Sequence, residues 1–290
     1  MPELPEVETT RLGLLPKVQG GRISRVLVRD RRLRWPIPAN LAKQLTGKTV
    51  VDITRRGKYL LWDCRASDTA DDHLRPGRTF QRGYFLNHLG MSGSLRLVNA
   101  VQSEQSPQKH DHLDIVFDSG ITVRYTDPRR FGAMLWIAGA APTHPLLDTL
   151  GPEPLSDGFN GASLYAAAEG RRVSVKEFIM NSQVVVGVGN IYASESLFHA
   201  GIHPGRAAGK VSRKRLDRLA EAIKGTLHKA IQAGGSSLRD YVQANGELGY
   251  FQVNAFVYGR DSLPCRVCDT PIRTMKQGQR STYFCPRCQK

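Results

Sequence analysis

Four cysteines near the carboxyl end of the chain restrict its fold more than any other feature. Cys265 and Cys268 form one Cys-x-x-Cys pair, and after sixteen intervening residues Cys285 and Cys288 form a second. Two such pairs at this separation are typical of a tetrahedral zinc site with four thiolate ligands. Four thiolates leave no open coordination position. We therefore expect one structural zinc ion per chain, which folds a β-hairpin and does not catalyse a reaction.

Disulfide bonds and redox chemistry are the two other common uses of paired cysteines. Disulfides need an oxidising compartment, but the first thirty residues contain acidic side chains and no apolar segment of the kind that directs export. A redox Cys-x-x-Cys motif does not usually occur as a matched pair. The fifth cysteine, Cys64, follows the apolar run Tyr59–Trp62 and is expected to be a small buried residue without a chemical role.

The chain is strongly basic. It contains 41 lysine and arginine residues against 26 acidic residues, which gives a formal net charge of +15. This excess favours a polyanionic partner, although charge alone does not distinguish DNA, RNA and an anionic membrane surface. No stretch approaches roughly eighteen uninterrupted apolar residues, which excludes a membrane span. A chain of 290 residues is expected to form two domains with separate cores.

The first half of the chain has mainly the sequence pattern of β-strands. A helix is expected after Pro5 and is expected to end at Pro16, and Gly20-Gly21 then turns the chain. Strand-like segments follow up to about residue 138, the clearest of them at 23–29, 49–62, 113–117 and 121–125. Several short strands of this kind predict a two-layer β-sandwich that carries the N-terminal helix. The polar segment 66–81 is expected to be a long surface loop.

The second half of the chain has the pattern of helices. Residues 138–145 have the composition of a linker, and beyond them a strong amphipathic helix is expected over 216–231, ended by Gly234-Gly235. A shorter helix is expected over 190–200. The glycine run at 186–190 can present backbone N–H groups to a phosphate, but a tight turn is the simpler interpretation.

The amino terminus offers a nucleophile. If Met1 is removed, Pro2 carries a free secondary amine with the carboxylate of Glu3 beside it. An α-amino group has a pKa of about 7.7–8.0, compared with about 10.4 for lysine, so it supplies far more unprotonated amine at neutral pH. Such an amine can attack a sugar or carbonyl carbon and form an iminium. The alternative is an ordinary helix start, with Pro5 at the first helical position and acids in the first turn.

Several segments together resemble one protein family. They are Pro2–Glu8, Arg56–Leu60, His88–Ser94, Tyr125–Gly132, Val186–Glu195 and the four-cysteine hairpin. Their order over the whole chain is similar to that of the bacterial formamidopyrimidine-DNA glycosylases, bifunctional glycosylase/AP lyases that repair oxidised purines. The resemblance implies a multidomain α+β fold. Its parts are an N-terminal β-sandwich catalytic domain (2–138), a linker (139–150), a helix–two-turn–helix DNA-binding domain (151–255) and a zinc finger (256–290).

The resemblance also implies chemical roles. Pro2 is the implied nucleophile, which attacks C1′ of the damaged nucleotide, and Glu3 is the implied acid that helps to open the sugar ring. Lys58 is the implied proton donor for β-elimination. Arg280 is the implied donor for δ-elimination, although arginine is a poor acid and is better suited to clamp a phosphate and stabilise leaving-group charge. Glu6 matches a further acid near the site, with a plain helix-start charge as the alternative.

Excision from a duplex requires that the damaged nucleotide be extruded and its place filled. Met91 and Phe131 match the inserted residues of the family, with core packing at strand ends as the alternative. Neighbouring glycines favour exposed turns for both. Arg129 matches the residue that faces the orphaned cytosine. The implied phosphate contacts are His110, Arg129, Arg171, Lys176 and Asn190.

Further features bear on the resemblance. Residues 234–250 match a family loop that closes over the lesion, and their glycines fit a mobile lid. The segment 66–81 is longer than the family position suggests, Arg171-Arg172 replaces the usual lysines, and Met1 must be removed before the amine can react. His110–His112 is not expected to bind a metal, because adjacent residues on a strand point to opposite faces.

The expected partner is double-stranded DNA that contains oxidised purines such as 8-oxoguanine and formamidopyrimidines. A monomer in the bacterial cytoplasm, acting at the nucleoid and not at a membrane, is expected. One alternative is an endonuclease VIII-like glycosylase for oxidised pyrimidines, against which Leu4 and the set Met91, Arg129 and Phe131 favour the purine enzyme. The other is a non-catalytic zinc protein that binds DNA. It explains the charge and the cysteines but gives no reason for a reactive amino terminus.

Overall fold

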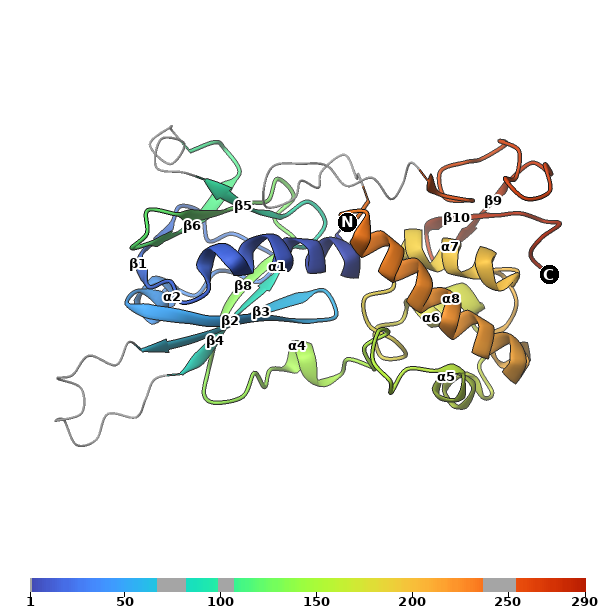
Figure 1. The fold of residues 1–290 in the computed structure, drawn as a ribbon, viewed down its shortest axis with the longest axis horizontal. Helices are drawn as coiled ribbons and strands as arrows, with labels where there is room; N and C mark the ends of the chain where they lie inside the picture. Colours follow the sequence, from blue (N-terminus) through green and yellow to red (C-terminus); the bar gives the residue numbers. More distant parts are fainter. Residues whose placement is uncertain (1, 67–81, 99–106, 237–253) are drawn as a thin grey trace. The chain divides into compact units, whose positions relative to one another are not determined.

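The computed structural model describes residues 2–66, 82–98, 107–236 and 254–290 (Figure 1). Met1, most of the long loop predicted at 66–81 and most of the lid segment predicted at 234–250 lie outside the described residues. The chain divides into two compact units, of which the first contains residues 6–148 and the second contains 149–236 and the described part of 250–290. Residues 3–5 belong to the second unit, although Pro2 before them and Glu6 after them belong to the first.

The first unit is the predicted β-sandwich. Its two sheets have the strand orders β1-β6-β7-β5 and β2-β3-β4-β8, and all paired neighbours are antiparallel (Figure 1). The strands are β1 (Ile23–Val28), β2 (Lys48–Arg56), β3 (Tyr59–Ala66), β4 (Gly83–His88), β5 (Ser94–Val98), β6 (Asp111–Phe117), β7 (Thr122–Thr126) and β8 (Ala133–Ala138). The short helix α2 (Leu41–Leu45) and helix α1 (Leu4–Val18), apart from its first two residues, complete the unit.

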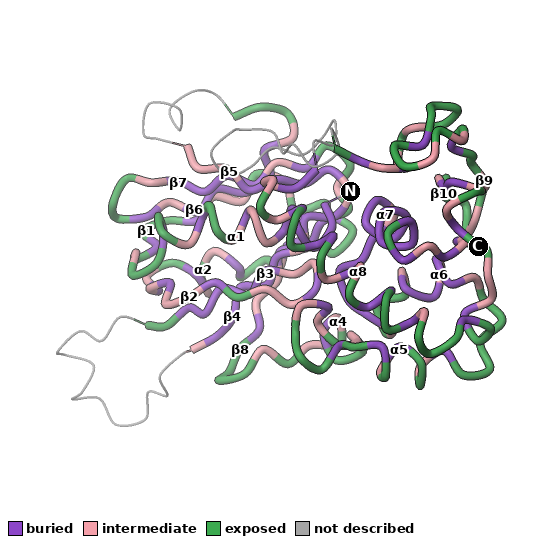
Figure 2. The backbone as a smooth tube through the Cα atoms, turned by 45° about the vertical axis from the view of Figure 1, so that its right-hand side comes forward, coloured by how far each residue is buried: buried purple, intermediate pink, exposed green. Residues whose placement is uncertain are grey.

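One core fills the space between these elements. Leu14 of α1 packs in the same cluster as Trp62 and Phe85 of one sheet and Leu113 of the other, and all four side chains are fully buried. Figure 2 shows the buried positions concentrated in the strands and in α1. Strands β3, β4, β6 and β7 are buried along most of their length and do not alternate between buried and exposed residues. Both sheets contribute side chains to this one core, as expected for a two-layer sandwich.

The end of α1 differs from the prediction. The helix does not stop at Pro16 but continues to Val18. Proline removes its own N–H donor from the helix and crowds the carbonyl four residues earlier. Beyond it, however, the N–H of Gln19 still donates to the carbonyl oxygen of Leu15 at 2.9 Å. The last turn therefore closes around the proline.

The segment 49–62 also differs from the prediction. It is not one strand but parts of two, β2 and β3, joined by the two-residue turn Gly57-Lys58. Gly57 has a φ of 57°, a conformation that favours glycine, and this is the place that mirror-image hairpin turns reserve for it. The strands on both sides have similar composition, so the single glycine was the only local signal of the turn.

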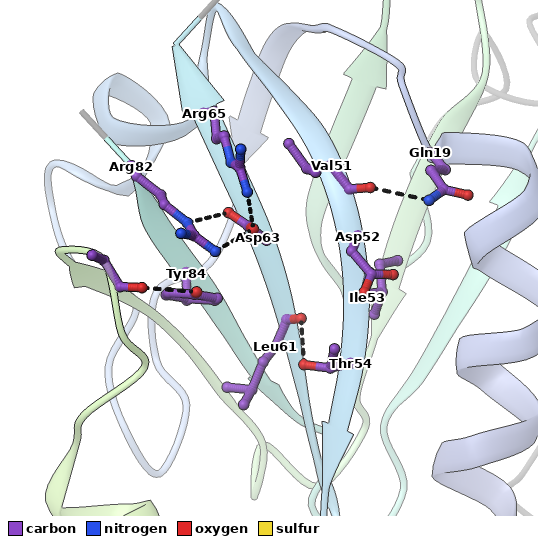
Figure 3. A network of polar contacts seen from close by, with 11 residues as sticks. Gln19, Val51, Asp52, Ile53, Thr54, Leu61, Asp63, Arg65, Arg82 and Tyr84 are labelled. Carbon is purple, nitrogen blue, oxygen red and sulfur yellow. Dashed lines mark hydrogen bonds and ion pairs between the residues drawn. The ribbon is translucent and has the colours of Figure 1, made fainter. Parts of the chain in front are cut away.

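A charged cluster lies at the end of β3 that is distant from Lys58 (Figure 3). The carboxylate of Asp63 accepts hydrogen bonds from Nε and Nη2 of Arg82 at 3.0 and 2.8 Å and from Nη2 of Arg65 at 3.1 Å. Burial alone would raise the pKa of Asp63, but the two guanidinium groups lower it. The cluster joins β3 to the residue before β4, where the described chain is interrupted.

The second unit is helical and ends in a β-hairpin. Its helices are α5 (Gly161–Ala168), α6 (Val175–Met180), α7 (Asn190–Ala200), the 3-10 helix η2 (Ala208–Lys210) and α8 (Arg213–Gln232). Both predicted helices are confirmed in α7 and α8, and the linker segment contains one short helix, α4 (Pro145–Asp148). The hairpin consists of β9 (Arg273–Gln277) and β10 (Arg280–Phe284).

Helix α7 is the centre of this unit. All but two of its eleven residues are buried (Figure 2), and Gly201 ends it in the left-handed conformation with a φ of 68°. The longer α8 buries only one apolar face, as its sequence pattern predicts. Among the described residues, no helix combines the length and the apolar character needed to cross a bilayer.

Candidate functional site

The amino terminus is seated on the glycine run before α7. The backbone N–H of Leu4 donates to the carbonyl oxygen of Gly187 at 3.2 Å. A Cβ atom on Gly187 would lie 2.6 Å from the Leu4 side chain, and one on Gly189 would lie 1.9 Å from the carboxyl carbon of Glu3. Any larger residue at these positions would therefore displace the first residues of the chain. The glycines serve the close approach of residues 3 and 4.

This seat, formed by Gly187 and Gly189, fixes the carboxyl group of Glu3 at the start of helix α7. Gly189 is the N-cap of α7 and offers no side chain to its first N–H groups. Unpaired N–H groups and the helix dipole make a helix start a favourable neighbour for a carboxylate. Glu3 is only 3% exposed, and Pro2 before it is also buried. Glu6 lies in the first turn of α1, as a helix-start charge would, and it is fully buried.

A buried lysine links three elements of the second unit. Lys176 on α6 is 1% exposed, and its Nζ donates to Oδ1 of Asn190 on α7 at 2.6 Å. The same Nζ donates to two atoms of β10, Oγ1 of Thr282 at 2.6 Å and the carbonyl oxygen of Ser281 at 3.3 Å. Nδ2 of Asn190 also donates to that carbonyl oxygen, at 3.0 Å. The start of α7 and the hairpin are thereby held together.

Charged neighbours surround this lysine. Burial, followed by repulsion from Arg280, lowers the pKa of Lys176 to about 8, and Glu3 and Glu177 act in the opposite direction. The structure therefore brings together four of the predicted residues in the second unit: Glu3, Lys176, Asn190 and Arg280.

The four cysteines converge as the sequence predicts. Their sulfur atoms all lie within 4.8 Å of one another. The Sγ atom of Cys268 lies 3.5 Å from that of Cys285 and 3.4 Å from that of Cys288, and Cys265 lies 4.0 Å from Cys288. A tetrahedral site with Zn–S bonds of about 2.3 Å has sulfur atoms roughly 3.8 Å apart. The cysteines therefore fit one structural zinc ion, whose role is to hold the hairpin.

The zinc hairpin presents Arg280 at its turn. Gly278 and Gln279 connect β9 to β10 and have φ values of 49° and 61°. Two consecutive positive φ values are characteristic of the tight turns that match the twist of paired strands. Arg280 follows directly and is exposed, so its guanidinium group is available to an anion.

Glu195 is a residue that the sequence did not single out beyond its place in the Val186–Glu195 motif. It is 1% exposed on α7, and its carboxylate accepts hydrogen bonds from the backbone N–H groups of Phe256, Val257 and Tyr258 at 2.8, 3.0 and 2.9 Å. It thus fixes the segment that leads into the zinc finger. Its only local signal is an acid among the apolar positions of the predicted helix.

In the first unit, Lys58 is half-buried in the turn between β2 and β3. Arg55 supports this turn, because its Nη1 donates to the carbonyl oxygen of Gly57 at 3.0 Å while its Nε donates to the carboxylate of Glu8 at 2.9 Å. Glu8 on α1 also accepts from Nη2 of Arg11 at 2.7 Å. The turn is thus tied to α1 by a chain of charged hydrogen bonds, which the sequence did not predict.

Two loops that carry other predicted residues are held together by Asp127. Its carboxylate accepts hydrogen bonds from Oγ of Ser92 at 2.7 Å and from the hydroxyl of Tyr125 at 2.9 Å. It also accepts from the backbone N–H groups of Arg129 at 3.2 Å and Gly132 at 2.9 Å. Asp127 is fully buried, and it lies in a segment that carried the resemblance without an assigned role.

These loops present Met91, Arg129 and Phe131. A Cβ on Gly90 would lie 2.5 Å from the backbone of Phe131, so the glycine permits the close approach of the two loops. Phe131 is 40% exposed and Met91 is half-buried. The Cζ of the exposed Arg129 lies 5.1 Å from the centroid of the Phe131 ring. The exposure of Phe131 does not fit the core-packing alternative.

The remaining predicted contacts lie on both units. His110 in the first unit is half-buried, and its carbonyl oxygen accepts from the N–H of Asp127 at 3.0 Å. His112 is buried with its Nε2 at 2.8 Å from the carbonyl oxygen of Asp127, and Asp111 accepts from Oγ1 of Thr126 at 2.6 Å. Arg171 in the second unit is exposed ahead of α6.

Models of known families match most of the chain. The formamidopyrimidine-DNA glycosylase N-terminal domain matches residues 1–134, and the H2TH domain of the same family matches residues 150–242. The zinc finger found in FPG and IleRS matches residues 262–290. The matched ranges follow the β-sandwich, the helical segment and the four-cysteine hairpin in the order of the chain.

Individual proteins agree with these matches. The chain is 55% identical to formamidopyrimidine-DNA glycosylase of Burkholderia ambifaria and 52% identical to that of Methylococcus capsulatus, in each case over the whole of both chains. It is similar to the crystal structure of the MutM (Fpg) protein of Thermus thermophilus, with 34% identity, a TM-score of 0.82 and coverage of 99% of this chain and 98% of that chain.

Related structures also include complexes with DNA. One is a complex between Lactococcus lactis Fpg and a Fapy-dG containing DNA, with 31% identity and a TM-score of 0.83 over 99% of this chain and 100% of that chain. Another is a complex between Lactococcus lactis Fpg and an abasic site containing DNA, with 32% identity and a TM-score of 0.84 over 99% of both chains. With its sandwich, its seated amino terminus and its zinc hairpin, the chain belongs to the formamidopyrimidine-DNA glycosylase family.

Proposed function

We propose that this chain removes oxidised purines, including 8-oxoguanine and formamidopyrimidines, from duplex DNA and then cleaves the strand. The observation that carries the proposal is the seat formed by Gly187 and Gly189, because it fixes the carboxyl group of Glu3 one residue away from the Pro2 nitrogen. The relatives crystallised with Fapy-dG DNA and abasic-site DNA support the same activity.

In the proposed reaction, removal of Met1 frees the Pro2 amine. Its nitrogen lone pair forms a bond to C1′ of the damaged nucleotide, and the base leaves with the electron pair of the glycosidic bond and takes up a proton. The Pro2 nitrogen then loses its proton, and its lone pair breaks the C1′–O4′ bond while Glu3 protonates O4′. The sugar ring opens and an iminium between Pro2 and C1′ remains. The iminium withdraws electrons, so a proton can be lost from C2′ while the 3′ phosphate departs with its bonding pair.

A second elimination then releases the 5′ phosphate. Lys58 is the proposed proton donor for the first elimination, and Arg280 is proposed to stabilise the charge of the departing phosphate in the second. Glu6 is proposed as a further acid near the site. The exposed turn that carries Arg280 and the supported turn that carries Lys58 are consistent with these roles.

The rest of the site is proposed to bind the damaged duplex. Met91 and Phe131 fill the gap left by the extruded nucleotide, and Arg129 faces the orphaned cytosine. His110, Arg129, Arg171 and Asn190 contact phosphates. We also propose the domain division 2–138, 139–150, 151–255 and 256–290, and a monomeric enzyme.

Borohydride trapping tests the proposal. Protein that begins at Pro2 is mixed with a duplex carrying 8-oxoguanine opposite cytosine, the iminium is reduced, and the attachment site is mapped by mass spectrometry. We expect a stable crosslink on Pro2 and none in a variant that retains one additional residue before it. The Pro2→Gly variant is expected to lose most base excision while still binding the damaged duplex.

Other outcomes would contradict this activity in defined ways. Preferential cleavage of a thymine glycol duplex would indicate an endonuclease VIII-like pyrimidine specificity. Binding without any cleavage, with zinc present and the amino terminus free, would indicate a DNA-binding protein. Unaltered turnover by Pro2→Gly would remove Pro2 from the mechanism.

A further inference from the structure

We propose that Lys176 is a positioning residue that aligns Asn190 and the Arg280 turn, and that it does not contact a DNA phosphate. The resemblance to the family implied a phosphate contact at this position. The proposal rests on the proposed function only in assigning Arg280 to strand cleavage, since its effect on DNA binding can be measured without any catalysis.

The hydrogen bonds of the ammonium group carry the argument. A protonated lysine has three N–H donors and no acceptor. Three acceptors lie within hydrogen-bond distance of Nζ: Oδ1 of Asn190, Oγ1 of Thr282 and the carbonyl oxygen of Ser281. A phosphate oxygen would have to displace one of them. The side chain is also only 1% exposed, so an anion in solvent has little access to it.

The three acceptors belong to the parts that need alignment. Asn190 begins α7 at the place where the carboxyl group of Glu3 is seated. Ser281 and Thr282 directly follow Arg280 on β10, and Thr282 is fully buried. The carbonyl oxygen of Ser281 receives hydrogen bonds from both Lys176 and Asn190, at 3.3 and 3.0 Å. Loss of the ammonium group would therefore remove two hydrogen bonds that hold Ser281 and Thr282, the residues of β10 next to Arg280.

The geometry also predicts which replacements fail. Arginine keeps the positive charge, but its planar guanidinium directs five donors over a wide fork, whereas the acceptors around Lys176 converge on one buried nitrogen. Arginine at a phosphate contact, in contrast, binds as well as lysine or better. Lys176→Arg thus separates a positioning role from a phosphate contact.

The first experiment compares Lys176→Arg with Lys176→Met. The probe is a duplex with a tetrahydrofuran abasic-site analogue, and the readouts are Kd, its dependence on salt, and bound zinc. We expect both variants to lose about 10–100-fold in affinity, with arginine no better than methionine, because both leave buried acceptors unsatisfied. A direct phosphate contact would give near-normal affinity for Lys176→Arg and, for Lys176→Met, a salt slope lower by about 0.9. That result would overturn the proposal.

A second variant keeps the test decisive if the lysine variants fail to fold. Thr282→Val removes one acceptor from a side chain that is too buried to reach DNA. The matched control is Thr226→Val on α8, where a buried threonine hydroxyl has no hydrogen-bond partner among the described residues. We expect Thr282→Val to weaken binding and to reduce the second elimination relative to the first, and Thr226→Val to do neither. Equal behaviour of the two variants would contradict the proposal.

A double-mutant cycle identifies the residue through which Lys176 acts. If it positions Arg280, then adding Arg280→Ala to Thr282→Val or to Lys176→Met should cost little beyond the larger single effect. Fully additive losses would mean that the two cations act independently and would overturn the proposal. Trapping on Pro2 in the unmodified protein tests the proposed function separately, so the two failures are distinguishable.

Discussion

Two hairpin turns, one in each unit, present a basic side chain in similar ways. The turn between β2 and β3 consists of Gly57 and Lys58, and the turn between β9 and β10 consists of Gly278 and Gln279, with Arg280 next. Both turns begin with a glycine at positive φ, 57° at Gly57 and 49° at Gly278. The two turns differ at their second residue, because Gln279 also has a positive φ, 61°, whereas Lys58 does not.

The supports behind the two turns are very different. Strands β2 and β3 belong to a four-stranded sheet that packs on a large core, in which Trp62 and Phe85 are fully buried. Strands β9 and β10 form a sheet of only two strands, and its apolar cluster is small, containing Cys265, Ile272 and Cys285. An isolated two-stranded hairpin is marginally stable in water. The second turn therefore depends on zinc and on the buried hydrogen bonds of Lys176.

This difference shows how one chain can fix two basic groups by unlike means. A side chain on a large sandwich needs only a few polar contacts to orient its turn, here those of Arg55. A side chain on a small hairpin needs a metal and a buried cation in place of the missing core. The two turns should accordingly fail under different perturbations.

Removal of zinc is expected to have the largest effect. Structural zinc sites contribute about 10–16 kcal/mol to folding, so chelation or Cys268→Ser should unfold the hairpin and weaken binding to damaged DNA by at least about 100-fold. All three tryptophans, Trp35, Trp62 and Trp136, lie in the first unit. Their fluorescence should stay native while binding is lost. Retention of DNA affinity in protein shown to be free of zinc would contradict this account.

Lys58→Ala is expected to have the next largest effect, on the proposed elimination chemistry. General acids contribute about 10²–10⁴-fold to rates, and elimination from an abasic-site duplex in single-turnover assays should slow by that order. Bound zinc and thermal stability should stay unchanged, because the turn rests on the sandwich core. Lys43→Ala, at an exposed lysine of α2, is the charge-matched control. An equal loss of elimination rate in both variants would mean that Lys58 acts only through its positive charge and not as a proton donor.

Arg55→Met tests the polar support of the first turn. The change removes the donors to Gly57 and Glu8 and leaves both acceptors without this partner. We expect the free energy of unfolding of the first unit, followed by tryptophan fluorescence in urea, to fall by about 1–3 kcal/mol. The elimination rate should fall by about tenfold, since a misplaced donor is costly. Zinc content should not change. Lys176→Met, in contrast, should lower zinc content and leave the free energy of unfolding of the first unit unchanged.

Local signals predicted much of the molecule. The cysteine spacing gave the zinc site, and the periodicity over 190–200 gave α7 with the bounds that the structure has. These features depend on residues close together in the chain. The end of α1 beyond Pro16 and the division of 49–62 were missed, because single residues decide them and periodicity averages over many.

The supporting contacts of the site were not predictable in the same way. Asp127, Glu195 and Arg55 act through backbone or side-chain groups that lie up to 63 positions away in the sequence. Lys176 shows the limit most clearly, since its residue type and position fit a phosphate contact, but its burial and its partners on β10 depend on the folded chain. A polar residue's type indicates what it can bind, and only its surroundings decide what it does bind.

The smallest expected effect is on the pH dependence of stability. It distinguishes the Glu8–Arg55 support of the Lys58 turn from the zinc support of the Arg280 turn. Burial alone would raise the pKa of Glu8, but hydrogen bonds and charge pairing with Arg11 and Arg55 lower it below its ordinary value of 4.5. A carboxyl group with a lowered pKa contributes stability above pH 4.5 and loses it as the pH falls through the folded-state pKa. Glu8→Gln should therefore flatten the acid side of the stability profile of the first unit, by less than about 1 kcal/mol.

Acid also protonates zinc-bound thiolates and releases the metal. Zinc release, followed with a chromophoric chelator, should be the same in Glu8→Gln as in the unmodified protein, because the carboxylate belongs to the first unit. The tryptophan-detected stability below pH 4.5 should differ between the two proteins, since only the unmodified chain has this carboxylate to protonate. Parallel stability profiles in the two proteins would show that the Glu8–Arg55 contact contributes nothing to the support of the Lys58 turn.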